Sequence, residues 1–262
     1  METYFIVSDL HMGDGSSADD FKPNKKLFLD FLEHVKRQEG TLILAGDVFE
    51  LWQADLQSIL KNNFEVFKML FELRPKVIVG NHDYYLKTFI DFDFVYYPAL
   101  QIEAESGDII RVEHGNVYDP NNDPEKNMQL GKIVAAAGGI AENWVHPDID
   151  ETFMSFVGKA KSVGNSVCEE ITTPWTEEKR TKKKQSNNNY VKAANNIVKE
   201  NDDISWVVFG HTHNAEIKHE QHYVNSGCWV KEIPSFVKID KNNIGLYEFR
   251  DNKEKERDSA KI

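Results

Sequence analysis

The 262-residue chain has few cysteines, no long apolar run and no excess of basic residues. Its two cysteines, Cys168 and Cys228, are too few for a disulfide framework in a chain of this length. No apolar run approaches the roughly 20 residues that a membrane-spanning helix needs, and no signal peptide is visible at the N-terminus. We therefore expect a cytoplasmic protein with reduced thiols, whose membrane contacts are limited to peripheral ones.

The charge balance is acidic, with 43 Asp and Glu against 31 Lys and Arg, a formal net charge of −12. Such a surface repels phosphate backbones, so general nucleic-acid binding is not expected. One dense basic run, Lys179–Lys184, departs from this balance. We interpret it either as a solvated loop or as an anion-binding segment for a phosphate group or an anionic lipid surface.

Five short apolar runs are each followed by side chains of the kind that bind metals. The runs are residues 5–7, 42–45, 76–79, 110–112 and 206–209, and the polar groups after them are Asp9 with His11, Asp47, Asn81 to Asp83, His114, and His211 with His213. Apolar and β-branched runs of this length are typical of buried strands. In open α/β sheets, sites form at the carboxyl ends of the strands. The pattern therefore predicts an α/β protein with a polar site along one edge.

The strand ends supply seven candidate metal ligands, namely Asp9, His11, Asp47, Asn81, His114, His211 and His213. Carboxylate and amide oxygens with imidazole nitrogens, and no thiolate, suit divalent Mn, Fe, Zn, Co or Ni. Seven ligands exceed the needs of one ordinary site. They suit two ions roughly 3.5 to 4 Å apart that share a bridging carboxylate, as in hydrolysis at phosphorus. Asp47 is placed to provide that bridge.

The order Asp-x-His, Gly-Asp, Gly-Asn-His-Asp, His-Gly and Gly-His-x-His resembles the calcineurin-like metallophosphoesterases at all five signature blocks, from Asp9 through His213. The resemblance implies a four-layer αββα fold, with two packed mixed sheets flanked by helices. It also implies two divalent ions, with Mn expected, and a bridging hydroxide that attacks phosphorus in line. In such a centre the first ion is held by Asp9, His11 and His213, the second by Asn81, His114 and His211, and both by Asp47.

His82 is not needed as a ligand in this scheme. We predict that His82 protonates the leaving oxygen or steadies the transition state, and that Asp83 orients it through the other ring nitrogen. Trp52 is either a core aromatic or a substrate contact. With Lys182 and Lys183 it completes the predicted substrate-binding set.

The alternation of strands and helices is interrupted after His114. We predict a metallophosphoesterase domain over residues 1–249, with a helical cap insertion over 117–188 because apolar residues recur at helical spacing through residues 149–167. Residues 250–262 are almost all charged and are predicted to be a disordered tail.

Three segments resemble the UDP-2,3-diacylglucosamine hydrolase branch, namely residues 46–52, the insertion after His114 and residues 227–229. Members of that branch cut a pyrophosphate in a lipid A precursor, and their insertion cradles acyl chains. This chain has His82 where the branch has Arg, and Asn116 where it has Asp.

We therefore expect a small-molecule or lipid-linked phosphate substrate, cleaved at a phosphoester or pyrophosphate bond. The alternatives are a phosphoesterase of other specificity, such as a monoesterase, diesterase or nuclease, and a non-catalytic protein-binding scaffold on the same fold. The complete ligand set argues against the scaffold, because crowded like charges destabilise a centre that binds no metal.

Overall fold

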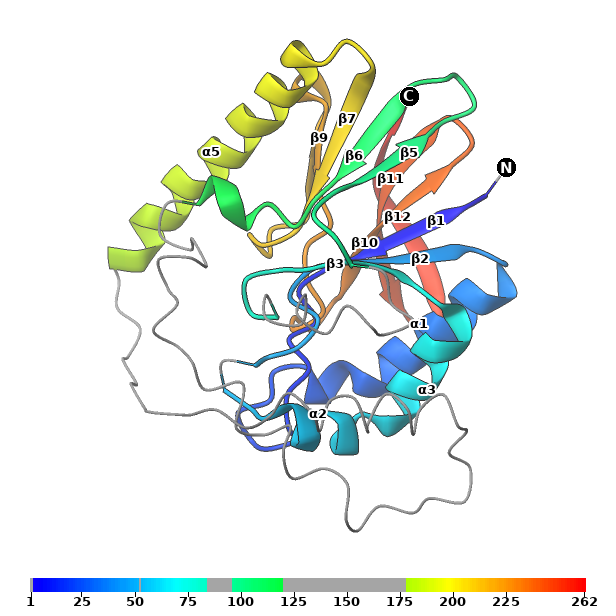
Figure 1. Cartoon of the computed structure of the whole chain (residues 1–262), viewed down its shortest axis with the longest axis vertical. Helices are drawn as coiled ribbons and strands as arrows, with labels where there is room; N and C mark the ends of the chain where they lie inside the picture. The colour runs from blue at the N-terminus through cyan, green and yellow to red at the C-terminus, as the bar shows by residue number, and fades with distance from the viewer. Residues whose placement is uncertain (1, 52, 84–95, 120–177) are drawn as a thin grey trace.

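A computed structural model describes residues 2–51, 53–83, 96–119 and 178–262, and shows two β-sheets packed face to face (Figure 1). Across the first sheet the strands are, in order, β12 (Lys253–Lys261), β11 (Asn243–Arg250), β10 (Ser235–Asp240), β1 (Tyr4–Val7), β2 (Thr41–Ala45), β3 (Lys76–Ile78) and β4 (Tyr96–Tyr97). Across the second they are β5 (Leu100–Glu103), β6 (Ile109–Val112), β7 (Ile204–Phe209), β9 (Tyr223–Asn225) and β8 (Glu216–Lys218).

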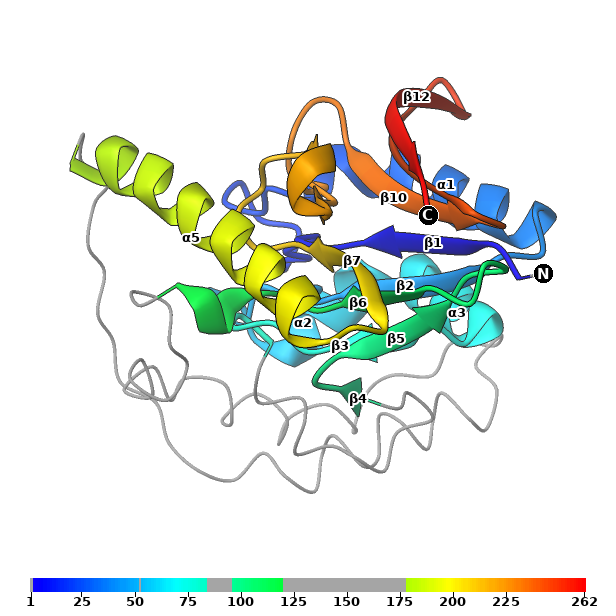
Figure 2. The ribbon, with the colours of Figure 1, turned by 90° about the horizontal axis from the view of Figure 1, so that it is seen from above.

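Helices cover the outer face of each sheet, as the two views show (Figures 1 and 2). The first sheet carries α1 (Lys25–Arg37), α2 (Leu56–Asn62) and α3 (Phe64–Leu73), and the second carries α5 (Glu178–Glu200). Short 3₁₀ turns are η1 (Lys22–Asn24), η3 (Asn116–Tyr118) and η5 (His219–Gln221). The predicted αββα arrangement of two mixed sheets with flanking helices is confirmed.

Strand periodicity divides the interior into three hydrophobic layers. In β1, Phe5 and Val7 pack into the cluster beneath the helices, whereas Ile6 packs into the cluster between the two sheets. Successive side chains of a strand point to opposite faces, so one strand serves both layers. A third cluster, around Tyr190 and Phe209, joins α5 to the second sheet.

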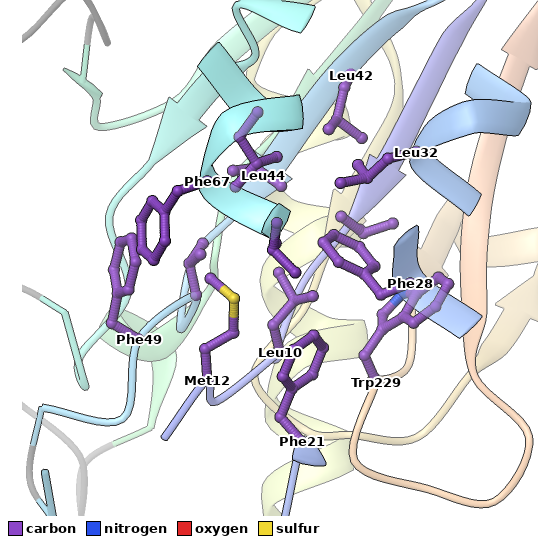
Figure 3. Close-up of a cluster of buried hydrophobic side chains, with 14 of the residues drawn as sticks. Leu10, Met12, Phe21, Phe28, Leu32, Leu42, Leu44, Phe49, Phe67 and Trp229 are labelled. Carbon is purple, nitrogen blue, oxygen red and sulfur yellow. The ribbon is translucent and has the colours of Figure 1, made fainter. Parts of the chain in front are cut away.

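The cluster beneath α1 to α3 is rich in aromatic side chains, as the close-up shows around Phe28 and Trp229 (Figure 3). Phe31 lies among them, with ring centroids 4.9 Å from Trp229, 5.0 Å from Phe236 and 5.2 Å from Phe249. These contacts join α1 to strands from the far end of the chain. The cluster therefore fixes the position of α1 on the sheet.

Replacing Phe31 with alanine is expected to lower the free energy of unfolding by about 3 to 5 kcal/mol, because a fully buried ring is lost and a cavity remains. Urea unfolding measures this change. Ile233→Ala is the control, since Ile233 is 41% exposed and surface changes usually stay within about 0.5 kcal/mol. Equal effects of the two substitutions would contradict the assignment of Phe31 to the core.

The direction of the strands gathers the polar blocks. β1, β2 and β3 are mutually parallel, as are β6, β7 and β9. Parallel strands end at one edge of their sheet, so the loops after five of these strands meet there. The two sheets are joined at that edge by the backbone N–H of His211, which donates to Asp9 Oδ2 at 2.9 Å.

The prediction of a disordered tail over 250–262 is wrong, because residues 253–261 form β12, antiparallel to β11. Charged side chains stay solvated on an edge strand while the backbone pairs, and charge at an edge also hinders edge-to-edge association. Glu254 receives Lys238 Nζ at 2.8 Å and faces His34 Nε2 at 3.1 Å. Cross-strand ion pairs thus take the role that apolar alternation plays elsewhere.

The predicted cap, residues 117–188, lies mostly outside the described residues. Its last residues, from Glu178, form the first turns of α5, so the basic run that we interpreted as a loop or an anion-binding segment has a helical backbone. Among the helices that the structure describes, none combines the length and hydropathy needed to cross a membrane.

Candidate metal centre

Five predicted ligands have a backbone conformation that residues other than glycine rarely adopt. Their φ angles are 55° at Asp9, 47° at His11, 52° at Asp47, 64° at His211 and 58° at His213. Non-glycine residues in this left-handed region are uncommon, and such strain concentrates at functional sites. The strand-end loops are thus bent to bring side chains together at one place.

Two glycines allow this close approach. A Cβ at Gly80 would overlap the carboxylate of Asp47, and a Cβ at Gly46 would overlap the ring of His114. Gly46 also has a φ of 91°, which favours glycine. The glycines of the Gly-Asp and Gly-Asn-His-Asp blocks therefore make room for the neighbouring ligands.

On one side of the centre lie Asp9, His11 and His213, whose potential ligand atoms are all within 4.8 Å of one another. His213 Nε2 is 3.1 Å from Asp9 Oδ1 and 3.1 Å from His11 Nε2. Two imidazole nitrogens facing each other at this distance compete for one proton. A divalent cation between them and the carboxylate would satisfy all three groups.

On the other side lie Asp47, His114 and His211, whose potential ligand atoms are also within 4.8 Å of one another. Asp47 Oδ2 is 3.2 Å from His114 Nε2 and 4.0 Å from His11 Nε2, so this carboxylate lies between the two groups. Asn81 Oδ1 is 3.2 Å from His114 Nε2. The structure thus brings all seven predicted ligands into two adjoining sets.

An unsatisfied oxygen shows that these residues fit a cation. Asp9 Oδ1 is fully buried and accepts no well-aligned hydrogen bond from the described residues, although it lies 3.1 Å from His213 Nε2. Asp9 Oδ2 accepts from Ser8 and from the His211 N–H. A buried carboxylate oxygen without a well-aligned donor is costly. The two divalent ions that the motif implies would be held by these oxygens and imidazoles, which are the donor types that borderline metals prefer.

In three of the imidazole rings, the nitrogen that points away from the centre faces an oxygen atom. His11 Nδ1 faces Glu50 Oε2 at 2.9 Å, and His114 Nδ1 faces the carbonyl of Ala45 at 2.9 Å. His211 Nε2 lies 3.7 Å from Asp119 Oδ2. Such contacts fix the tautomer and the orientation of a ligating histidine. In each ring the opposite nitrogen is the one that faces the centre.

His82 lies at the rim of the centre, with its backbone N–H donated to Asp47 Oδ1 at 2.8 Å. Its Nδ1 is 2.9 Å from Glu50 Oε1. The prediction that Asp83 orients His82 is wrong. The buried Asp83 carboxylate accepts from Gly80 N and Val48 N, both at 2.7 Å, so it fixes the loop and Glu50 contacts the histidine.

Carboxylate and imidazole charges stabilise each other within the cluster. Burial alone would lower the pKa of His114, but the charge and hydrogen bond of Asp47 raise it to about 9. Against the same effect of burial, the charge of Asp9 raises the pKa of His213 to about 9. Burial would raise the pKa of Glu50, yet hydrogen bonds to His11 and His82 lower it to about 2. Without metal, these shifts favour carboxylate–imidazolium pairs between Asp47 and His114 and between Asp9 and His213, whereas burial lowers the pKa of His211.

Metal affinity is therefore expected to rise with pH. His114 and His213, with pKa values of about 9, are protonated near neutral pH, and an ion must displace those protons. For each proton displaced, the metal affinity should rise by about tenfold per pH unit, up to roughly pH 9. Calorimetric titration with Mn²⁺ in buffers of different ionisation enthalpy measures both effects. An affinity independent of pH, without proton release, would contradict these protonation states.

The predicted substrate contacts are not brought to the centre by the described residues. Trp52 lies outside them. The backbone of Lys182 and Lys183 lies in α5, in the part that precedes Tyr190. The Tyr190 ring centroid is 5.8 Å from that of His211, so this helix runs beside the metal centre.

Comparison with known families agrees with the geometry. The family model for calcineurin-like phosphoesterases matches residues 3–215, which include all five motif blocks. The chain belongs to the calcineurin-like phosphoesterase family. A search of curated proteins finds no match.

Two phosphoesterases are among the solved structures that a search finds for this chain. A dimetal phosphatase from Danio rerio is 10% identical, with a TM-score of 0.44 over 94% of this chain and 95% of that chain. The calcineurin-like phosphoesterase YfkN from Bacillus subtilis is 14% identical, with a TM-score of 0.42 over 98% of this chain and 88% of that chain. The family assignment rests on the family match and the motif residues.

Two residues of this phosphoesterase centre were missed from the sequence. Glu50 could have been found from the sequence, since this acidic residue lies only three positions after the predicted ligand Asp47. Asp119 could not, because it lies at the start of the predicted cap and only the folded chain brings it near His211. Both are buried carboxylates that contact a histidine of the centre.

Proposed function

We propose that this calcineurin-like phosphoesterase is a dinuclear metal-dependent hydrolase of phosphoester or pyrophosphate bonds. The observation that carries the proposal is the position of the Asp47 carboxylate between His11 and His114. Each of these histidines belongs to a group of residues that could hold a metal ion. A carboxylate in that position is the natural bridge between two cations. Asp9, His11 and His213 would hold one ion, and Asn81, His114 and His211 the other.

Two divalent ions bound there would stabilise negative charge on the phosphoryl oxygens and lower the pKa of a water between them. Protonation of the leaving oxygen would be carried out by protein side chains. His82, which contacts Glu50 through Nδ1, would protonate the leaving oxygen through its second ring nitrogen, Nε2. Asp47 receives the His82 backbone N–H and thereby keeps the imidazole next to the centre.

The finer proposal concerns a lipid-linked pyrophosphate of the UDP-2,3-diacylglucosamine type. It is supported by the sequence likeness of residues 46–52 and 227–229 to that branch, and opposed by His82 and Asn116, where the branch differs. Trp52, Lys182 and Lys183 would then contact the substrate. Lys183 lies seven residues before Tyr190, about 10 Å along the helix, a reach that suits a second anionic group. A lipid substrate would also require peripheral membrane contact.

A substrate panel tests both levels of the proposal. Mn²⁺-loaded protein is offered a chromogenic phosphomonoester, a chromogenic bis-ester, UDP-2,3-diacylglucosamine and the unacylated UDP-glucose. Turnover confined to the acylated nucleotide supports the lipid pyrophosphatase. Turnover of the small esters alone keeps the phosphoesterase and removes that specificity. Failure to cleave any substrate with Mn, Fe, Zn, Co or Ni would sink the enzymatic proposal and favour the scaffold.

A further inference from the structure

The ring of His211 has one nitrogen directed into the centre and one directed away from it. Nδ1 lies 3.3 Å from His114 Nε2, within the second set of candidate ligands. Nε2 lies 3.7 Å from Asp119 Oδ2. A histidine that ligates through Nδ1 must carry its proton on Nε2, and an acceptor at that position selects this tautomer.

Asp119 is held in place by its own local structure. It caps η3, and its backbone N–H donates to the Asn116 carbonyl at 3.1 Å. The preceding Tyr118 donates its hydroxyl to Glu113 Oε2 at 3.1 Å, and its ring lies 5.2 Å from that of Phe209 at the end of β7. The Asp119 carboxylate is therefore buried beside His211 by a turn that is anchored to two neighbouring strands.

The His211 backbone is fixed independently, through its hydrogen bond to Asp9 Oδ2 at 2.9 Å. The rings of His114 and Tyr190 lie against the His211 ring, with centroids at 5.1 Å and 5.8 Å. These two contacts limit where the ring can lie. Among the described residues, the Asp119 carboxylate is the acceptor that faces Nε2, and an acceptor there favours the tautomer protonated at Nε2.

We infer that Asp119 is a positioning residue that holds His211 in the Nε2-protonated tautomer and so presents Nδ1 to the second metal ion. This inference rests on the proposed two-ion centre. Its specific content is that Asp119 acts on the second ion, held with Asn81 and His114, and leaves the first unaffected. Loss of such a supporting contact typically costs about 10- to 100-fold in metal affinity.

The experiment measures Mn²⁺ binding to the full chain by calorimetry and by electron paramagnetic resonance. The variants are Asp119→Ala, which removes the acceptor, and Asp119→Asn, which keeps its size and one acceptor oxygen. Asp258→Asn is the matched control, since Asp258 faces His219 at 3.1 Å on an exposed surface. Resonance separates spin-coupled Mn²⁺ pairs from isolated ions, so it shows which occupancy is lost without any assay of activity.

For Asp119→Ala we expect one Mn²⁺ equivalent to weaken by about 10- to 100-fold while the other is unchanged, with isolated Mn²⁺ replacing the coupled pair. Asp119→Asn should give an intermediate shift, and Asp258→Asn none. Equal weakening of both equivalents, or no change in either, overturns the inference. If the alanine variant does not fold, the asparagine variant decides by the same criterion. A wild-type chain that binds two Mn²⁺ but cleaves no ester would refute the proposed function, and the metal titration would still judge Asp119.

Discussion

Replacing Asp47 with alanine is expected to reduce hydrolysis by about 10³-fold or more, because loss of bridged metal ions removes several kcal/mol of transition-state stabilisation. Asp47 Oδ2 is the oxygen that lies near both His11 and His114. The variant should therefore lose coupled metal binding together with activity.

The measurement combines kcat/KM with metal content by mass spectrometry after desalting. Asp258→Ala serves as the control, because its carboxylate lies on the edge strand β12, faces the exposed His219 at 3.1 Å and belongs to none of the groups of candidate ligands. Its kinetics and metal content should match those of the wild type. Two tightly bound ions in Asp47→Ala, with activity retained, would rule out Asp47 as the bridge.

Replacing His82 with alanine is expected to lower kcat by about 10²- to 10⁴-fold, the usual range for a lost general acid, while metal content stays at the wild-type level. The reason lies in the contacts of the ring, which reaches Glu50 through Nδ1, whereas the groups Asp9, His11, His213 and Asp47, His114, His211 do not include His82. Steady-state kinetics on phosphate esters of differing leaving group measure the loss. The reduction in kcat should be larger for esters with a poor leaving group, because departure of such a group depends more on its protonation.

His82 also forms a metal-type group with His11 and Glu50, so the same experiment separates two roles. A general acid gives a leaving-group dependence with unchanged metal content. Loss of a metal ion from His82→Ala, with equal loss of rate on every ester, would instead make His82 a ligand. Glu50→Gln should reduce kcat as well, because Glu50 contacts both histidines at 2.9 Å.

Most of the metal centre could be predicted from the sequence, because each ligand directly follows an apolar run. The spacing of Asp9 or His114 from its strand is set locally, and parallel strands then bring distant blocks to one edge. The apolar runs 42–45 and 206–209 lie within the observed strands β2 and β7, which span residues 41–45 and 204–209. Five ordered blocks also identified the family before any contact was known.

The contacts behind the ligands could not be predicted in the same way. Asp83 was assigned to His82 because the two are adjacent in sequence, but the turn after Gly80 directs the Asp83 carboxylate onto backbone N–H groups. Glu50 reaches His82 from another loop, over a separation of 32 residues. Adjacent side chains diverge in a tight turn, so neighbours in sequence are poor guides to partners of a catalytic histidine.

The prediction of a disordered C-terminal tail, made from the charge pattern, was wrong for a related reason. A segment of alternating charges has no apolar face, yet β12 pairs along β11 over eight registered positions. Its cross-strand partners, such as Tyr247 for Glu256, come from the preceding strand. Similarly, helical spacing of apolar residues continues from Ile59 to Leu73, but this segment is divided between α2 and α3. The Asn63 side chain donates to the carbonyls of Ile59 and Gly13 at the end of α2. Both outcomes depend on tertiary partners.

The measurement that bears most directly on a two-ion phosphoesterase centre is a titration of the metal-free chain with Mn²⁺, following hydrolysis and bound metal together. The seven ligands around Asp47 predict that two equivalents bind and that hydrolysis develops with the second. Full activity at one equivalent, or hydrolysis that does not depend on added metal, would contradict the dinuclear centre.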